Sequence, residues 1–476
     1  MVVVWLMRPL PPVRQKPAII QREFKGESRL DALSLQPSFA TETKNFTSAA
    51  YPALSVRPGF SDLHSPSTSK VLGLGVWKDK ELHAVFGDGT WWRYRDGAWT
   101  KLTSGLDTSA EWSFTNVKAN LLDINLVGTN GKDGVRAYNG TTVTSIGNPV
   151  AGLNLIEQYY DRLWAAVNNT LHATAGGTAD KWQTFNGDDE DSYFIGIDTP
   201  DGETITAVKA GIGHVTIFKQ TSMHEMFGAM VSTFRVQPVT YDIGAINNRC
   251  VVTIGGIMYI LDRNGIYEYM GGAVPSKQFS IPVQWYVDNI NPETRDKCAV
   301  GTNGQKLYVS MPIGNSLLPN VILEYDPSKG TWYTWKDIQP NCFANVGNDL
   351  YVGDNNGRIW KLGGATDGNS PVSSVWVSKA FTAQSMSQTI RWLKAWITAT
   401  IPAGSSMNVY MSKQVSGDDD WTIVQSIPAT TVISSRPIYI RSNVAVNARY
   451  IRLKIECTGP VTIHEIAREE DYLPLR

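Results

Sequence analysis

The sequence contains few charged residues, and this composition argues against some classes of function. Charged residues make up 18% of the 476 residues, below the ~25% typical of soluble proteins. A net charge of −1 argues against a chain whose whole surface binds nucleic acid, because such proteins carry a strong basic excess. A weakly charged surface is easier to bury in an interface, so the composition favours a component of an assembly.

Cysteine motifs and long apolar runs are also missing. The four cysteines are far apart and form no CxxC pair, which fits neither a disulfide framework nor a zinc site. We expect buried, reduced thiols and folding in a reducing cytoplasm. Residues 1–7 are apolar but lack the basic start and the cleavage site of a signal peptide. No run approaches the ~18 apolar residues of a membrane span.

Motifs of catalysis are equally scarce. The histidines show no HExxH or HxH spacing, and the chain has neither a GxSxG elbow nor a GxxxxGK[ST] phosphate loop. The acidic runs 188–191 and 418–420 are contiguous, unlike the spaced ligands of a calcium loop, and we interpret them as solvated loop tips. Asp161, Asp198 and Asp201 leave open a glycosidase-like carboxylate pair. We expect a non-enzymatic chain without metal or cofactor.

From residue 61 to 364 the chain repeats short β-rich runs separated by tight turns. Asp-Gly and Asn-Gly pairs tolerate the positive φ of two-residue primed turns, and they recur at residues 88–89, 133–134, 264–265 and 356–357. A spacing of ~40–50 residues is typical of a four-stranded propeller blade. We therefore predict an all-β fold with a β-propeller of about seven blades, whose Trp and Tyr side chains pack between blades. The alternative is an irregular stack of β-meanders that never closes.

The two flanking regions have a different pattern. Residues 365–372 form a Gly/Asn/Pro linker, and strands beyond it, such as 450–456, alternate apolar and charged residues. Residues 365–476 are therefore predicted to form a β-sandwich. Residues 1–60 are Pro-rich and basic at their start, which predicts an extended N-terminal arm that docks on its own body or on a neighbour; the alternative is a solubilising tail. The candidate partner-binding residues are Arg8, Arg14, Lys16, Arg22, Lys25 and Arg29.

Three stretches together carry a resemblance to a known family. They are residues 53–60 (ALSVRPGF), residues 324–332 (EYDPSKGTW) followed by Trp335, and the closing strands at 408–412 and 449–455. The chain resembles propeller-containing bacteriophage virion proteins, and it is similar in length and layout to the tail-hub, or packaged-DNA stabilisation, proteins of short-tailed phages. In that family an Arg-Pro-Gly segment precedes a propeller and a β-sandwich follows. The Pro-rich residues 1–30 have no counterpart in this resemblance.

The resemblance implies a structural role in the virion. About six copies would form a ring below the portal and its adaptor. The ring, made in the host cytoplasm, would continue the DNA channel, retain the packaged genome and let DNA pass its lumen without sequence specificity. The alternative is a receptor- or glycan-binding tail protein that stacks sugars on aromatic clusters such as 91–92 and 332–335. An enzyme, with carboxylates or a metal at the mouth of the propeller, is the third hypothesis.

Overall fold

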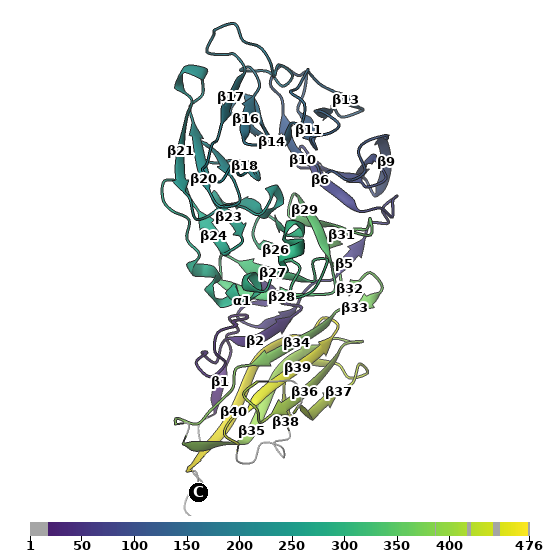
Figure 1. Ribbon diagram of the computed structural model, residues 1–476. Coiled ribbons are helices and arrows are strands. Elements are labelled where there is room, and N and C mark those ends of the chain that lie inside the picture. Colours follow the sequence, from purple (N-terminus) through teal and green to yellow (C-terminus); the bar gives the residue numbers. More distant parts are fainter. Residues whose placement is uncertain (1–17, 386, 417–419, 441–447, 475–476) are drawn as a thin grey trace, which may run out of the picture.

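The computed structural model describes residues 18–385, 387–416, 420–440 and 448–474, and almost all of them lie in β-strands or the turns between them. A ring of small sheets occupies one end of the molecule, and two larger sheets, built from both ends of the chain, occupy the other (Figure 1). The prediction of an all-β chain is confirmed. No helix among the described residues is long and apolar enough to cross a membrane.

Between residues 60 and 362, all of them described, the strands form seven successive antiparallel groups. The first and second are β6 (Val71–Trp77), β7 (Glu81–Phe86), β8 (Thr90–Arg95) and β9 (Ala98–Thr103), then β10 (Ser113–Val117), β11 (Asn125–Thr129), β12 (Arg136–Tyr138) and β13 (Val143–Ser145). The third and fourth are β14 (Asn154–Tyr159), β15 (Arg162–Val167), β16 (Thr170–Ala173) and β17 (Tyr193–Gly196), then β18 (Ala207–Ala210), β19 (Val215–Phe218), β20 (Met223–Phe227) and β21 (Arg235–Thr240).

The last three groups complete the ring. They are β22 (Val251–Ile254), β23 (Ile257–Asp262) and β24 (Gly265–Tyr269); β25 (Ala299–Thr302), β26 (Leu307–Met311), β27 (Val321–Asp326) and β28 (Thr331–Trp335); and β29 (Pro340–Val346), β30 (Asp349–Asp354), β31 (Ile359–Leu362) and β5 (Phe60–Asp62). Because β5 precedes the first group in sequence, the N-terminal side of the chain supplies the outer strand of the last group. The connection from β24 to β25 holds the short helices η4 (Gln278–Val283), α1 (Gln284–Asp288) and η5 (Pro292–Lys297).

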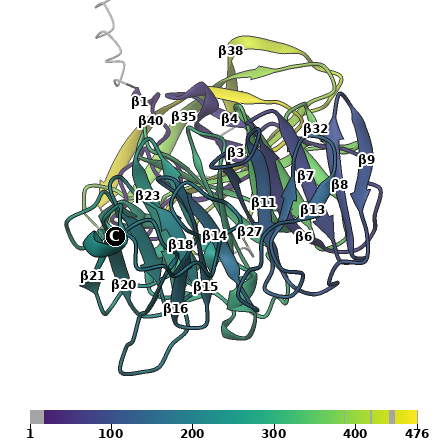
Figure 2. The same cartoon turned by 90° about the horizontal axis from the view of Figure 1, so that it is seen from above.

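The seven groups meet in a closed ring of β-propeller type (Figures 1 and 2). The first strand of each group contacts that of the next, through the 3-10 turn η3 (Asn248–Cys250) between the fourth and fifth groups, and β29 returns to β6. Seven hydrophobic clusters each lie between two neighbouring groups. The predicted packing of aromatic residues between blades is therefore confirmed, and Trp91, Trp332 and Trp335 are buried there and not available to sugars.

The Asp-Gly and Asn-Gly pairs lie at hairpin turns, as the sequence predicts, but these are not the predicted primed turns. Asp88-Gly89 lies between β7 and β8, Asp133-Gly134 between β11 and β12, and Asn356-Gly357 between β30 and β31, and in each pair only the glycine has positive φ; Asn264 lies in the turn after β23, and Gly265 begins β24. Gly89 has φ +76°, and a Cβ there would lie 2.5 Å from the carbonyl oxygen of Leu106, so only glycine fits. Local turn chemistry therefore fixes the hairpins from which each sheet of the ring is built.

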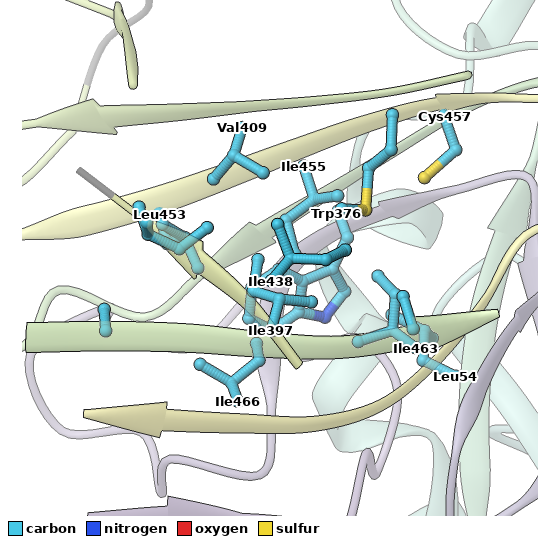
Figure 3. Close-up of a cluster of buried hydrophobic side chains, with 14 of the residues drawn as sticks. Leu54, Trp376, Ile397, Val409, Ile438, Leu453, Ile455, Cys457, Ile463 and Ile466 are labelled. Carbon is cyan, nitrogen blue, oxygen red and sulfur yellow. The ribbon is translucent and has the colours of Figure 1, made fainter. Parts of the chain in front are cut away.

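At the other end of the molecule two sheets face one core (Figure 3). One contains β3 (Phe46–Thr47), β4 (Leu54–Val56), β40 (Thr462–Pro474), β35 (Gln388–Ile401) and β38 (Ile433–Ile440), with β1 (Ile19–Gln21) paired to β40. The other contains β2 (Ala40–Lys44), β34 (Ser373–Ser378), β39 (Arg452–Thr458), β36 (Ser406–Ser412) and β37 (Thr422–Ile427). Within residues 18–56 of the predicted arm, four strands thus belong to these sheets. The predicted linker holds the small hairpin of β32 (Thr366–Asp367) and β33 (Ser370–Pro371).

The cysteines behave as small core residues. All four are buried and none forms a disulfide, as the sequence predicts. Burial raises the pKa of the Cys250, Cys342 and Cys457 thiols to about 12, so they remain protonated.

A buried polar cluster links the first two groups of the ring. His83 on β7 accepts a hydrogen bond from the indole N–H of Trp91 at 3.1 Å through Nδ1, so its Nε2 carries the proton and points to the Glu81 carboxylate at 3.2 Å. The ring of Tyr138, on β12 of the next group, lies 4.5 Å from the imidazole centroid. Burial disfavours the imidazolium more than Glu81 favours it, so the pKa of His83 is lowered and the ring stays neutral.

This cluster predicts a pH-dependent contribution to stability. The unfolded histidine titrates near ~6.5 and the folded one at a lower pH. The unfolded chain therefore binds more protons, and the free energy of unfolding falls as the pH drops below ~6.5. The variant His83→Gln keeps a hydrogen-bond donor and an acceptor but does not titrate. Between pH 7.5 and 5.5 we expect its free energy of unfolding to fall by on the order of 1 kcal/mol less than that of the wild type. Urea unfolding at both pH values measures this; equal losses in the two proteins would assign the pH dependence elsewhere.

Candidate functional site

Of the six basic residues predicted to contact a partner, the structure describes three, Arg22, Lys25 and Arg29. Arg8, Arg14 and Lys16 lie outside the described residues. Each of the other three pairs with a carboxylate of its own chain. The distances are 2.7 Å from Arg22 to Glu465, 3.4 Å from Lys25 to Glu23 and 2.7 Å from Arg29 to Glu27. Only the Arg22 side chain is largely exposed, at 71%.

The partner of Arg29 is the centre of the junction between the ring and the C-terminal sheets. Glu27 is fully buried, and one carboxylate oxygen accepts hydrogen bonds from the amide and hydroxyl of Thr43 on β2, at 2.8 and 3.0 Å, and from the hydroxyl of Thr334 on β28, at 2.8 Å. The other oxygen accepts from Arg29 and from the phenol of Tyr286 on α1. The buried charge is therefore satisfied by donors from three separate segments.

Backbone contacts hold Glu27 in this position. Its amide donates to the carbonyl of Trp332 at 2.7 Å. The preceding Gly26 has φ +81°, and a Cβ there would lie 2.1 Å from the same carbonyl oxygen, so the close approach requires glycine. Next to this contact β2 bridges β28 on one side and pairs with β34 on the other. One nine-stranded sheet consequently runs from the sixth group of the ring into the C-terminal region.

A second buried charge fixes the other side of the junction. Arg57, from the Arg-Pro-Gly segment, is fully buried and donates two hydrogen bonds to Asp367 of the linker hairpin, at 2.9 and 2.7 Å. It also donates to the side chain of Asn45 and to the carbonyl of Lys336. At Gly59 a Cβ would lie 1.9 Å from the carbonyl oxygen of Thr366. The Arg-Pro-Gly segment, which carries the family resemblance, thus holds the linker hairpin next to the end of β28.

A cleft of about 500 Å³ opens beside this junction. The Trp285 side chain is 45% exposed in it, and the guanidinium of Arg29 lies 5.1 Å from the indole centroid. Lys336 and Asp337 also line the cleft. An exposed aromatic face among polar groups of both signs can stack on a ring-shaped ligand and hydrogen-bond to its hydroxyls.

The third group of the ring carries an exposed aromatic pair. Phe185 and Phe194 are 57% and 58% exposed, and their centroids lie 6.0 Å apart in an edge-on contact. His172 stacks on the other side of Phe194 at 6.0 Å. Phe194 belongs to β17, the outer strand of its sheet, whose free edge faces away from β16. Exposed apolar side chains at a sheet edge are typical of a contact surface for another protein.

The acidic run 188–191 lies between these two phenylalanines. Asp191 is buried, and its carboxylate accepts hydrogen bonds from amides of its own loop, including those of Gly187 and Asp188. Buried Arg162 lies 3.6 Å from the carboxylate of Glu190 and donates to loop carbonyls. The acids at 188–190 are exposed, as expected of a solvated tip. Among the described residues no cluster of His, Cys, Asp or Glu has the composition of a metal site.

The other candidate carboxylates are hydrogen-bonded to neighbouring loops. Asp161 accepts from the amide of Gly177, Asp198 from the side chain of Asn169, and Asp201 from the hydroxyl of Thr221. These bonds satisfy the three acids locally. Residues 418 and 419 of the second acidic run lie outside the described residues.

Glu27 lies at one of the most constrained points of the fold, but in the sequence it looks like an ordinary charged residue until its distant partners are known. Arg57 belongs to the Arg-Pro-Gly segment of the family resemblance, but its partner Asp367 was not predicted. A signal for Phe185 and Phe194 did exist, since two phenylalanines bracketing a solvated acidic loop have no local core to enter.

Comparison with known proteins identifies neither a family nor a function. No protein-family model matches the chain, and no curated protein sequence matches it. Among solved structures it is similar to the WD40 propeller domain of Doa1, with 8% identity, TM-score 0.41 and 64% and 96% of the two chains covered. For the Neurospora crassa Pan2 WD40 domain the values are 9%, 0.42, 65% and 95%. For the Myceliophteria thermophila Cps50 (Swd1) propeller domain they are 11%, 0.43, 64% and 99%. Values this low carry no inference about function.

The burial of Glu27 makes a direct prediction about stability. Glu27→Gln removes the charge and leaves Arg29, Tyr286 and the two threonines with one suitable acceptor fewer inside the junction. We expect the free energy of unfolding to fall by about 3 kcal/mol or more, measured by urea denaturation. The matched control is Glu293→Gln at an exposed position, which should change it by less than about 0.5 kcal/mol. Equal effects would show that the junction does not depend on this carboxylate.

Proposed function

We propose that this protein is a structural subunit of a bacteriophage tail, a tail-hub or head–tail connector component. In this role several copies form a ring below the portal and its adaptor. The ring retains the packaged DNA and forms part of the ejection channel. The proposal combines the family resemblance of the Arg57-Pro58-Gly59 layout with the architecture of the chain.

The finer architecture is part of the same proposal. The seven strand groups are seven blades, because one hydrophobic cluster lies in each of the seven spaces between neighbouring groups. The two C-terminal sheets form a β-sandwich, because side chains from both enter one core. A nine-stranded sheet then joins the sandwich to the sixth blade. Such a body transmits force between its two ends, as a part of a DNA-ejecting machine must.

The observation that carries the proposal is the exposed edge of β17 with its aromatic pair. Strand β17, which carries Phe194, lies in the ring at one end of the molecule, whereas β1 lies in the body at the other end (Figure 1). The sequence before β1 is apolar and carries Arg8, Arg14 and Lys16 without an acid. Its charge and apolar character complement the β17 edge of a second copy. Contacts between opposite ends of successive subunits generate rings when the rotation closes.

The DNA path in this proposal runs between subunits and not along the propeller axis. The Asn248 side chain donates to the Ser113 hydroxyl, three blades away, at 3.1 Å. Next to it Arg249 reaches Glu111 at 2.7 Å. Side chains therefore cross the axis, and the only space wide enough for a duplex is a lumen enclosed by several copies.

Light scattering of the purified protein, alone and with its portal and adaptor, tests the ring. We expect a mass near six subunits. The double variant Phe185→Ser/Phe194→Ser should need at least about a tenfold higher protein concentration for assembly, since it lacks the two aromatic side chains that the contact between subunits would bury. Removal of residues 1–17, which leaves Glu27 in place, should have the same effect. Leu122→Ser changes a fully exposed side chain of another blade and should assemble as the wild type does. A protein that stays monomeric and binds neither the portal nor the adaptor would contradict the proposal.

A glycan-binding tail protein is the second candidate, and the cleft at Trp285 favours it. If the cleft binds sugar, a glycan array will give specific signals, and Trp285→Ala will weaken them at least about tenfold because the stacking face is lost. Tyr241→Ala, an exposed aromatic outside the cleft, is the matched control. Signals that survive Trp285→Ala would remove the cleft from consideration.

A further inference from the structure

A cavity of about 260 Å³ lies on the axis of the ring. The innermost strands β6, β10, β18, β22, β25 and β29 each contribute to its wall. The Asn248–Ser113 hydrogen bond and the Arg249–Glu111 ion pair cross the ring at one end of the cavity. Toward the other end, Thr302 and Asn345 line the wall and are partly exposed. The cavity is therefore accessible to solvent and to a small ligand.

Part of the wall of the pocket is apolar, and part of it is polar. Phe114 on β10 and Phe343 on β29 line it, and their rings also pack against the clusters between neighbouring groups; Leu74 and Val252 line it as well. Phe343 comes close because its neighbour on β25 is Gly301, where a Cβ would lie 2.3 Å from the Cβ of Phe343. A ligand in the pocket consequently meets aromatic and aliphatic surface, which favours an apolar body.

Three polar groups at this wall lack partners among the described residues. The Lys209 ammonium makes neither a hydrogen bond nor an ion pair within 4.0 Å, although burial lowers its pKa and the charge of Glu157 partly offsets that. The buried Oδ1 of Asn345 and Nε of Arg249 are also without hydrogen-bond partners. Unpaired polar groups in a shielded site cost free energy, and a ligand with complementary groups recovers it.

We propose that this axial pocket binds a small organic carboxylate with an apolar body. The carboxylate accepts a hydrogen bond from Lys209, the body packs between Phe114 and Phe343, and a hydroxyl or amino group donates to Asn345. At ~30 Å³ for each water-sized group, the volume holds on the order of ten non-hydrogen atoms. A nucleotide is too large for the pocket. Inorganic phosphate has no apolar part that could contact Phe114 and Phe343, so it is a poorer fit than an organic carboxylate. This function is separate from the assembly proposed above, because none of these residues lies at the β17 edge.

Calorimetric titration of the intact protein with phenyllactate, benzoate and benzyl alcohol tests the pocket. We expect phenyllactate to bind with a dissociation constant below about 1 mM. Benzyl alcohol, which lacks the carboxylate, should bind at least about tenfold more weakly. Lys209→Met should weaken phenyllactate binding by the same factor, and Lys209→Arg should retain part of it.

The control is Lys80→Met, which removes an exposed lysine from a turn of the first blade and should leave binding unchanged. Thermal unfolding of each variant separates loss of the fold from loss of the site, because Lys209→Met relieves the burial of a charge and should melt no lower than the wild type. No binding of any carboxylate up to about 10 mM would overturn the proposal. Binding that persists unchanged in Lys209→Met would overturn it as well.

Discussion

The structure depends on one buried carboxylate, that of Glu27. An ionised group removed from water is tolerated only where hydrogen bonds replace its hydration, and here the donors come from β2, β28 and α1. The C-terminal sheets, the sixth group of the ring and the helical connection before it must therefore all be in place before this charge is satisfied. Arg57 and Asp367 impose the same condition on the linker hairpin. A junction built from opposite buried charges couples two bodies that would otherwise be joined by a short linker.

Chain topology strengthens this coupling. The N-terminal side of the chain supplies β1 to β4 to the C-terminal sheets and β5 to the last group of the ring. The ring is closed by pairing between β5 and β31, strands about three hundred residues apart in sequence. Segments near both ends of the chain thus meet at one place, and neither body is complete without residues 40–62. The relative orientation of the exposed β17 edge and the opposite end is consequently set by the fold, which is the property an assembling subunit needs.

The aromatic side chains of the ring fall into two sets, those buried between neighbouring sheets and those accessible to a partner or ligand. Most Trp and Tyr side chains of the repeat fill the spaces between neighbouring sheets, and many of their indole and phenol groups also donate hydrogen bonds, as Trp332 does to the carbonyl of Phe279 and Trp335 to the carbonyl of Phe46. Other aromatic side chains remain accessible, and five of them matter for the proposals made above. Phe185 and Phe194 lie at the rim, Trp285 lies beside the junction, and Phe114 and Phe343 line the axial pocket. The rim with Phe185 and Phe194 has acidic neighbours, the cleft at Trp285 has charges of both signs, and the axial pocket contains Lys209. The three places therefore suit different partners.

By itself the sequence determined the all-β class, the hairpins and their order, because an Asp-Gly or Asn-Gly turn such as Asp88-Gly89 acts through local φ values and needs no distant partner. It also marked Arg57-Pro58-Gly59 as unusual without giving its role. The tertiary structure alone decided which charges are buried, since Arg29 and Glu27 read as surface residues until Thr43, Tyr286 and Thr334 are brought to them. It likewise decided which aromatics stay exposed, because burial depends on neighbours hundreds of residues away, which no local pattern specifies.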